Sequence, residues 1–157
     1  MSVSRRQHAV ERTADGSALS ALVVQVLRLE GLFSQAGDEL AAPMGQTTAR
    51  WRVLAAVEDE AKPVAQIARE WGLARQSVQR VADLLADEGL VTYDENPAHR
   101  RAKLVRLSAS GRRALTRIQR AQVTWANELG AAIGARDLER ASGVLERLLG
   151  ALVEPGA

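Results

Sequence analysis

The alternation of apolar and polar residues is most regular between Pro63 and Gly89. Apolar residues recur there at intervals of three and four, which is the spacing of a buried helical stripe. The first stripe consists of Val64, Ile67, Ala68 and Trp71. The second consists of Leu73, Val78, Val81, Leu84 and Leu85. Gly72 stands between them, and glycine accepts the left-handed backbone of a sharp helix end. The pattern predicts two short helices joined by a tight turn, with both stripes in the core.

Small residues occupy the places where these two helices would meet. Ala68 is small where a close crossing requires it, and Gly72 follows four residues later at the turn. This arrangement is typical of a helix-turn-helix, whose second helix lies in the major groove of DNA.

The outward face of the second predicted helix carries groups that can read DNA bases. It consists of Arg75, Gln76, Ser77, Gln79 and Arg80. Arginine can donate two hydrogen bonds to guanine, and glutamine can make two with adenine. The alternative is the solvated face of an ordinary core helix. Such a face usually mixes both charge signs, whereas this one has no carboxylate before Asp83. We therefore predict that this face contacts DNA.

One helix is predicted near the start of the chain. Residues 1–16 are polar and charged, and we expect a flexible tail there in preference to an arm that touches DNA. An amphipathic helix is then expected from Ser17 to about Ala36. Its apolar residues are Leu19, Leu22, Val23, Val26, Leu27 and Phe33.

A break separates this helix from a second one. Residues 41–45 interrupt the helical pattern, because Pro43 disfavours helix in the residue before it and Gly45 makes the chain after it more flexible. The second helix starts near Thr47 or Thr48, either of which can cap it through its hydroxyl. Its apolar residues are Trp51, Val53, Leu54 and Val57.

The period changes after Gly89. Residues 90–93 and 103–107 are β-branched and aliphatic segments of strand length, and a turn-rich loop joins them. Two strands and a basic loop after a recognition helix predict a wing whose cations reach the minor groove. The alternative is a hairpin whose arginines only keep it soluble. The candidate wing contacts are His99, Arg100, Arg101 and Lys103.

Two more helices complete the expected fold. Ser108 is a suitable cap for a long helix that ends at Gly134, and a last helix starts near Asp137. Together with the first helix they carry more apolar surface than a small winged domain can cover, which favours a two-fold dimer. We expect a mainly α fold with a β-hairpin wing. The expected divisions are a tail (1–16), an N-terminal dimerisation helix (17–45), a winged helix-turn-helix (46–110) and C-terminal dimerisation helices (111–157).

Composition excludes several classes of protein. The 157 residues are 46% hydrophobic, enough for one proper core, and the formal net charge is only +2. There is no cysteine, so disulfides and thiolate metal sites are excluded, and two histidines cannot build a metal site alone. We find no signal peptide and no uninterrupted apolar run of about 18 residues, so we expect a cytoplasmic protein without a membrane span.

The sequence gives little support for catalysis. No nucleophile stands near a histidine in a known motif, and no glycine-rich phosphate loop follows a strand. We predict that the protein is not an enzyme and needs no cofactor or metal. The alternative to DNA readout is a winged-helix module that binds other proteins.

The order of the predicted elements resembles the MarR family of bacterial transcriptional regulators. The resemblance covers about Ser17 to Val153 and is most specific in residues 96–111, which are similar to the family's wing signature. Three positions depart from the usual pattern. His99 stands where an aspartate is usual, Ser108 where a threonine is usual, and Ala74 where a hydroxyl cap often opens the recognition helix.

The resemblance implies a dimeric repressor that binds an inverted-repeat operator in duplex DNA and is released by a small aromatic or anionic ligand. In the family such ligands bind between the dimer-forming helices and the winged domain. The candidates here are Phe33, Trp51 and Arg52, where Trp51 offers an apolar wall and Arg52 an anion partner. The alternative for Trp51 is an ordinary core residue. Adjacent helical positions also point about 100° apart, so Trp51 and Arg52 need not share a cavity.

Overall fold

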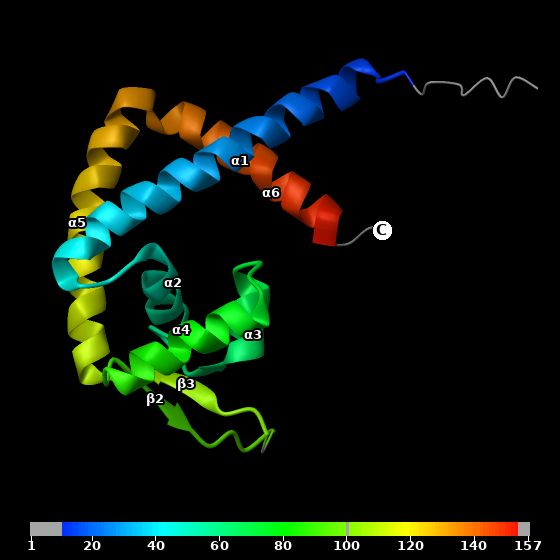
Figure 1. Ribbon diagram of the computed structural model, residues 1–157. Helices are drawn as coiled ribbons and strands as arrows, with labels where there is room; N and C mark the ends of the chain where they lie inside the picture. The colour runs from blue at the N-terminus through cyan, green and yellow to red at the C-terminus, as the bar shows by residue number, and fades with distance from the viewer. Residues whose placement is uncertain (1–10, 100, 154–157) are drawn as a thin grey trace, which may run out of the picture.

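The computed structural model describes residues 11–99 and 101–153. Helices dominate, and a small antiparallel sheet carries the wing, so the predicted fold class is confirmed (Figure 1). The elements in chain order are α1 (Ala14–Ala41), the 3₁₀ helix η1 (Ala42–Met44), α2 (Thr48–Ala56), β1 (Lys62–Pro63), α3 (Val64–Glu70), α4 (Arg75–Asp87), β2 (Val91–Asp94), β3 (Leu104–Leu107), α5 (Ala109–Ile133) and α6 (Ala135–Val153).

Helix α1 is longer than predicted at both ends. It begins at Ala14 because the hydroxyl of Thr13 accepts a hydrogen bond from the Gly16 amide at 3.0 Å, which is an N-cap. The end of the predicted tail is therefore helical, and residues 1–10 lie outside the described part of the chain. The helix continues past Ala36 to Ala41 and tightens into η1 before Gly45, whose φ of 67° ends it.

The helix-turn-helix is formed by α3 and α4. Gly72 has a φ of 61°, as the turn requires. Two residues that we expected in the core are exposed: Trp71 by 44% and Leu84 by 49%. Helix α3 ends at Glu70, so Trp71 lies in the turn, where the helical period no longer applies.

The buried stripe of α4 differs from the predicted one for a geometric reason. It consists of Val78, Ala82 and Leu85, which recur at intervals of four and three. Leu84 points to another side of the helix, while Leu73 and Val81 pack at the edge of the core. The small side chain of Ala82, fully buried, lets α4 approach its neighbours closely.

The sheet has three strands in the order β1-β3-β2, whereas the sequence indicated two. In the extra strand, Lys62 pairs with Val105 and Pro63 with Leu104. Proline cannot donate a backbone hydrogen bond, and it is tolerated here because β1 is an edge strand. The wing strands pair with Val91 opposite Leu107 and with Tyr93 opposite Val105.

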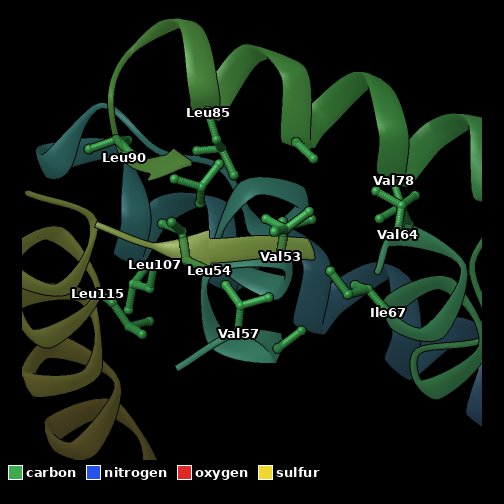
Figure 2. Packing of buried hydrophobic residues seen from close by; sticks show 14 of the residues in the cluster. Val53, Leu54, Val57, Val64, Ile67, Val78, Leu85, Leu90, Leu107 and Leu115 are labelled. Atoms are coloured by element: carbon green, nitrogen blue, oxygen red, sulfur yellow. The ribbon is translucent and has the colours of Figure 1, made fainter. Parts of the chain in front are cut away.

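The core lies between the helix-turn-helix, α2 and the start of α5 (Figure 2). Leu54 from α2, Ile67 from α3, Leu85 from α4 and Leu115 from α5 are each fully buried. Because these side chains come from four helices, they form one core, in which α4 packs directly against α2 and α3.

Helices α1 and α6 extend beyond the core (Figure 1). Large apolar residues on them are exposed, including Val24, Leu27, Leu32, Leu149 and Leu152. The segment Ala14–Met44, with a mean hydropathy of 1.3, is long and apolar enough to cross a membrane, but the core helix of a soluble protein or a signal sequence meets the same criteria. The exposed apolar surface of the single protomer is thus concentrated on these two helices.

Candidate nucleic-acid interface

The N-terminal half of α4 presents its polar residues away from the core. Arg75, Gln76, Ser77 and Arg80 are exposed, and Gln79 is half-buried. Because Val78 and the rest of the buried stripe fix the rotation of the helix, Gln76, Ser77 and Arg80 lie on the opposite face. Arg75 and Gln79 lie between that face and the stripe, on the side of the wing. The structure thus displays the predicted recognition face, and its contact with DNA stays a prediction.

The start of α4 has no side-chain cap. Ala74 is the N-cap residue and makes no side-chain hydrogen bond, as the sequence predicts. Amides at the start of a helix favour an anion, because they are unpaired and the helix dipole is positive there. A DNA phosphate could therefore take the place of the missing cap.

The loop of the wing is shaped by Asn96. Its side-chain oxygen accepts a hydrogen bond from the Ala98 amide at 3.0 Å, and its backbone oxygen accepts one from the His99 amide at 3.1 Å. At the base of the wing, Arg106 forms an ion pair with Asp94 across the two strands. The loop therefore projects from an anchored hairpin.

Among the predicted wing contacts, His99, Arg101 and Lys103 are exposed, and Arg100 lies outside the described residues. Arg101 and Lys103 line a cavity of about 360 Å³ together with Arg75 from the start of α4. Asp83 also lines this cavity and contributes a carboxylate. The fold thus brings cations from the wing and the recognition helix to one concave surface, where a negatively charged DNA backbone would be attracted.

One side chain of the predicted recognition face is engaged within the protein. The Gln79 amide nitrogen donates to the carboxylate of Asp83 and to the phenol oxygen of Tyr93, each at 2.8 Å. The phenol donates in turn to the same oxygen of Asp83 at 2.6 Å. Burial and this carboxylate raise the pKa of Tyr93 well above its ordinary value, so the phenol keeps its proton.

Tyr93 and Asp83 were not predicted as parts of this site. Asp83 could have been found, because it lies four residues after Gln79 on the same helical face. Tyr93 could not, because its position depends on how β2 packs against α4.

Two cavities flank Trp51, which is half-buried between them. The first, of about 280 Å³, is lined by Phe33, Gly37, Leu40, Trp51, Gln122 and Trp125. The second, of about 370 Å³, is lined by Thr48, Trp51, Arg52, Ala55, Trp71, Gln119 and Gln122. Trp51 and Arg52 therefore do share a cavity, while Phe33 lies on the other side of Trp51.

Phe33 and Arg52, two of the residues proposed to bind a ligand, have neighbours that the sequence did not indicate. The ring of Phe33 meets that of Trp125 edge-on, with centroids 6.2 Å apart. A guanidinium nitrogen of Arg52 lies 3.4 Å from the Ser34 hydroxyl and 3.6 Å from the carboxylate of Glu30. An anion in the second cavity would thus compete with Glu30 for Arg52.

No metal-binding cluster of three or more histidine, cysteine or carboxylate residues is found in residues 11–99 and 101–153. The carboxylate of Glu58 accepts a hydrogen bond from Gln119 at 2.8 Å. The backbone oxygen of Glu58 accepts another from Arg112. These contacts tie the end of α2 to α5, which is a structural role.

Comparison with known proteins agrees with this geometry. The family model described as "MarR family" matches residues 45–102. An uncharacterised protein of Mycobacterium tuberculosis is 39% identical over 134 residues, which cover 85% of this chain and 94% of that protein.

Two solved structures illustrate the similarity in fold. A MarR family transcriptional regulator from Streptomyces coelicolor has a TM-score of 0.74 at 21% identity, over 86% of this chain and 95% of that one. CouR from Rhodococcus jostii, bound to p-coumaroyl-CoA, has a TM-score of 0.72 at 20% identity, over 81% of this chain and 90% of that one.

Proposed function

Because the chain belongs to the MarR family of transcriptional regulators, we propose that it binds operator DNA as a homodimer and represses transcription until a small aromatic anion releases it. The observation that carries the DNA-binding part is the shared cavity of Arg75, Arg101 and Lys103 between recognition helix and wing. In this proposal residues 46–110 form the DNA-binding unit.

The recognition helix and the wing have different tasks in this proposal. Gln76 and Arg80 are exposed on α4 and read base edges in the major groove. Arg101 and Lys103 neutralise phosphates near the minor groove, where they add affinity that depends little on sequence. His99 and Arg100 belong to the same loop and have the same proposed task.

The apolar surfaces of α1 and α6 support the homodimer. Leu27 is 68% exposed and Leu149 is 62% exposed in the single protomer. Contiguous exposed apolar surface of this kind marks a contact with another chain or a membrane. A second copy would cover it symmetrically and place two recognition helices on one side, as an inverted repeat requires. We therefore propose that α1 serves the dimer and that the protein acts in the cytoplasm.

The two cavities beside Trp51 support a small-molecule effector. They are lined by aromatic rings and a few polar groups, as ligand sites often are, and Arg52 can pair with a carboxylate or phenolate. The binding of p-coumaroyl-CoA by CouR supports an aromatic ligand for this fold. A ligand releases DNA only if it binds the DNA-incompetent arrangement more tightly than the competent one.

The alternative function is a winged-helix module that binds proteins. The cationic cavity between the wing and α4 favours DNA, because a duplex presents a regular row of negative charge that three converging cations can neutralise.

Selection of bound duplexes from a random pool tests the proposal. We expect an inverted repeat whose half-site centres lie about one helical turn apart. Titration with a full palindrome and with an isolated half-site should then give one dimer per palindrome and much weaker binding to the half-site. Failure to enrich any sequence would contradict the proposed DNA binding, and equal affinity for palindrome and half-site would contradict the proposed dimer.

A further inference from the structure

The carboxamide nitrogen of Gln79 contacts two oxygen acceptors within the protein. A carboxylate only accepts hydrogen bonds, so the Gln79 atom at 2.8 Å from Asp83 must be the nitrogen and not the oxygen. The same nitrogen lies 2.8 Å from the phenol oxygen of Tyr93. An amide nitrogen carries two hydrogen atoms, so one is available for each of these contacts.

The direction of each hydrogen bond is fixed by the third contact. The phenol of Tyr93 donates its single hydrogen to Asp83 at 2.6 Å, so its oxygen can only accept from Gln79. The amide nitrogen of Gln79 and the phenol of Tyr93 thus both donate within the protein. The network joins the recognition helix to strand β2, where Tyr93 is held opposite Val105.

The network limits what Gln79 can offer to DNA. In general a glutamine reads adenine by donating to N7 and accepting from the N6 amino group. With both amide hydrogens engaged, the polar group that remains on Gln79 is its oxygen, an acceptor. Gln79 is half-buried and lines the cavity between α4 and the wing, so its side chain reaches the surface proposed for DNA.

We infer that Tyr93 and Asp83 act as positioning residues that make Gln79 an acceptor only, so that it reads the exocyclic amino group of adenine or cytosine. These two bases place an amino donor in the major groove, whereas guanine and thymine place a carbonyl acceptor there. The inference rests on the proposed entry of α4 into the major groove. It replaces the bidentate reading of adenine that residue type alone suggests for Gln79.

The test begins with the operator that the wild-type protein selects. Affinities are measured for all four base pairs at each operator position, for the wild type and for Gln79→Ala. The position at which the alanine variant loses its preference is the one that Gln79 reads. There the wild type should bind adenine and cytosine within about threefold of each other, and guanine and thymine about tenfold more weakly.

Tyr93→Phe then tests the role of the network. It keeps the ring in the core but removes the phenol oxygen, which frees one amide hydrogen of Gln79. That hydrogen can now donate to adenine N7, so the preference for adenine over cytosine should rise by about three- to tenfold. The cytosine affinity serves as the internal reference, because a purely structural loss of stability would weaken both complexes equally. A circular dichroism melt of the variant establishes that it is folded.

The possible outcomes distinguish failure of the inferred role of the network from failure of the proposed function. An increased adenine-to-cytosine ratio in Tyr93→Phe supports the network. An unchanged ratio, or a wild type that prefers guanine or thymine at that position, would overturn it. It would also be overturned if Gln79→Ala altered preference at no position. If the wild type bound no DNA sequence at all, the proposed function itself would fail.

Discussion

Gly111, in the first turn of α5, packs directly against the backbone carbonyl of Leu90 at the start of the wing. A side chain at position 111 would overlap that oxygen and also the side chain of Leu107. The backbone of Leu90 is fixed, since its amide donates to the Leu85 oxygen and its own oxygen accepts from the Ser108 amide. This contact sets how closely α5 approaches the start of β2.

Gly111→Ala should therefore lower stability. The added methyl group meets backbone, which cannot rotate away, and overpacking of this kind costs about 1–3 kcal/mol. Urea unfolding followed by circular dichroism measures the loss. Gly130→Ala in the same helix is the matched control, because its new methyl group would approach nothing nearer than the Leu138 side chain at 3.9 Å. That variant should be at least as stable as the wild type, since alanine favours helix.

Ser108→Ala should also destabilise the protein, by about 1 kcal/mol. The Ser108 hydroxyl accepts from the Gly111 amide at 3.0 Å and lies 2.7 Å from the Gly89 carbonyl oxygen, so it caps α5 and ties it to the end of α4. Ser108→Thr retains the hydroxyl and should unfold like the wild type. Equal midpoints for the alanine and threonine variants would argue against the capping role.

Exposed residues on the recognition helix and the wing should differ in their effect on DNA binding. Gln76→Ala or Arg80→Ala should relax base preference, at about 1–3 kcal/mol for each bidentate pair of hydrogen bonds to a base. Arg101→Ala or Lys103→Ala should weaken binding evenly across sequences and reduce the slope of affinity against salt concentration by about one for each phosphate contact.

Fluorescence anisotropy with operator variants at several salt concentrations measures both quantities. Arg140→Ala is a suitable control for the loss of one positive charge, because Arg140 lies on α6, away from α4 and the wing (Figure 1). Its affinity should match that of the wild type. The assignment of tasks would be wrong if the wing variants lost only base preference.

If the proposed dimer forms through α6, Leu149→Glu should convert it to a monomer without unfolding the protomer. The side chain is 62% exposed in the single chain, so the substitution costs the protomer little, but a charge buried between two copies is strongly unfavourable. Sedimentation equilibrium measures the mass. Leu84→Glu, also at an exposed leucine but on α4, should remain dimeric. A dimer that tolerated the change at position 149 would place the interface elsewhere.

An aromatic acid such as salicylate should quench tryptophan fluorescence and lower DNA affinity over the same concentration range. Trp51 lines both cavities, so Trp51→Ala should weaken both effects together. Arg52→Ala should weaken them for carboxylates more than for neutral aromatic amides, because it removes the cation. Quenching and DNA release that persist unchanged in Trp51→Ala would exclude this residue from the site.

The sequence alone predicted the order of the helices, the turn at Gly72 and the family, although not every helix boundary, because these depend on signals within a short stretch of chain. The left-handed turn at Gly72 and the Ser108 cap of α5 were both predicted and are both observed. Apolar spacing also placed α3 and α4 correctly. Such signals are local, since the conformation of a turn or a cap is set by its own residue and the next few.

Only the tertiary structure decided which groups face one another. The two-residue strand β1 is too short to show a pattern, and it exists because β3 offers it a partner. Trp71 fits the core stripe by spacing but is exposed, because α3 ends just before it. The same holds at the candidate site. By residue type alone, Gln79 is expected to have its whole amide available for a base. In the structure, β2 brings Tyr93, 14 residues later in the chain, to that amide. Contacts of this kind depend on the register of a sheet and its packing on a helix, and no local sequence signal specifies either.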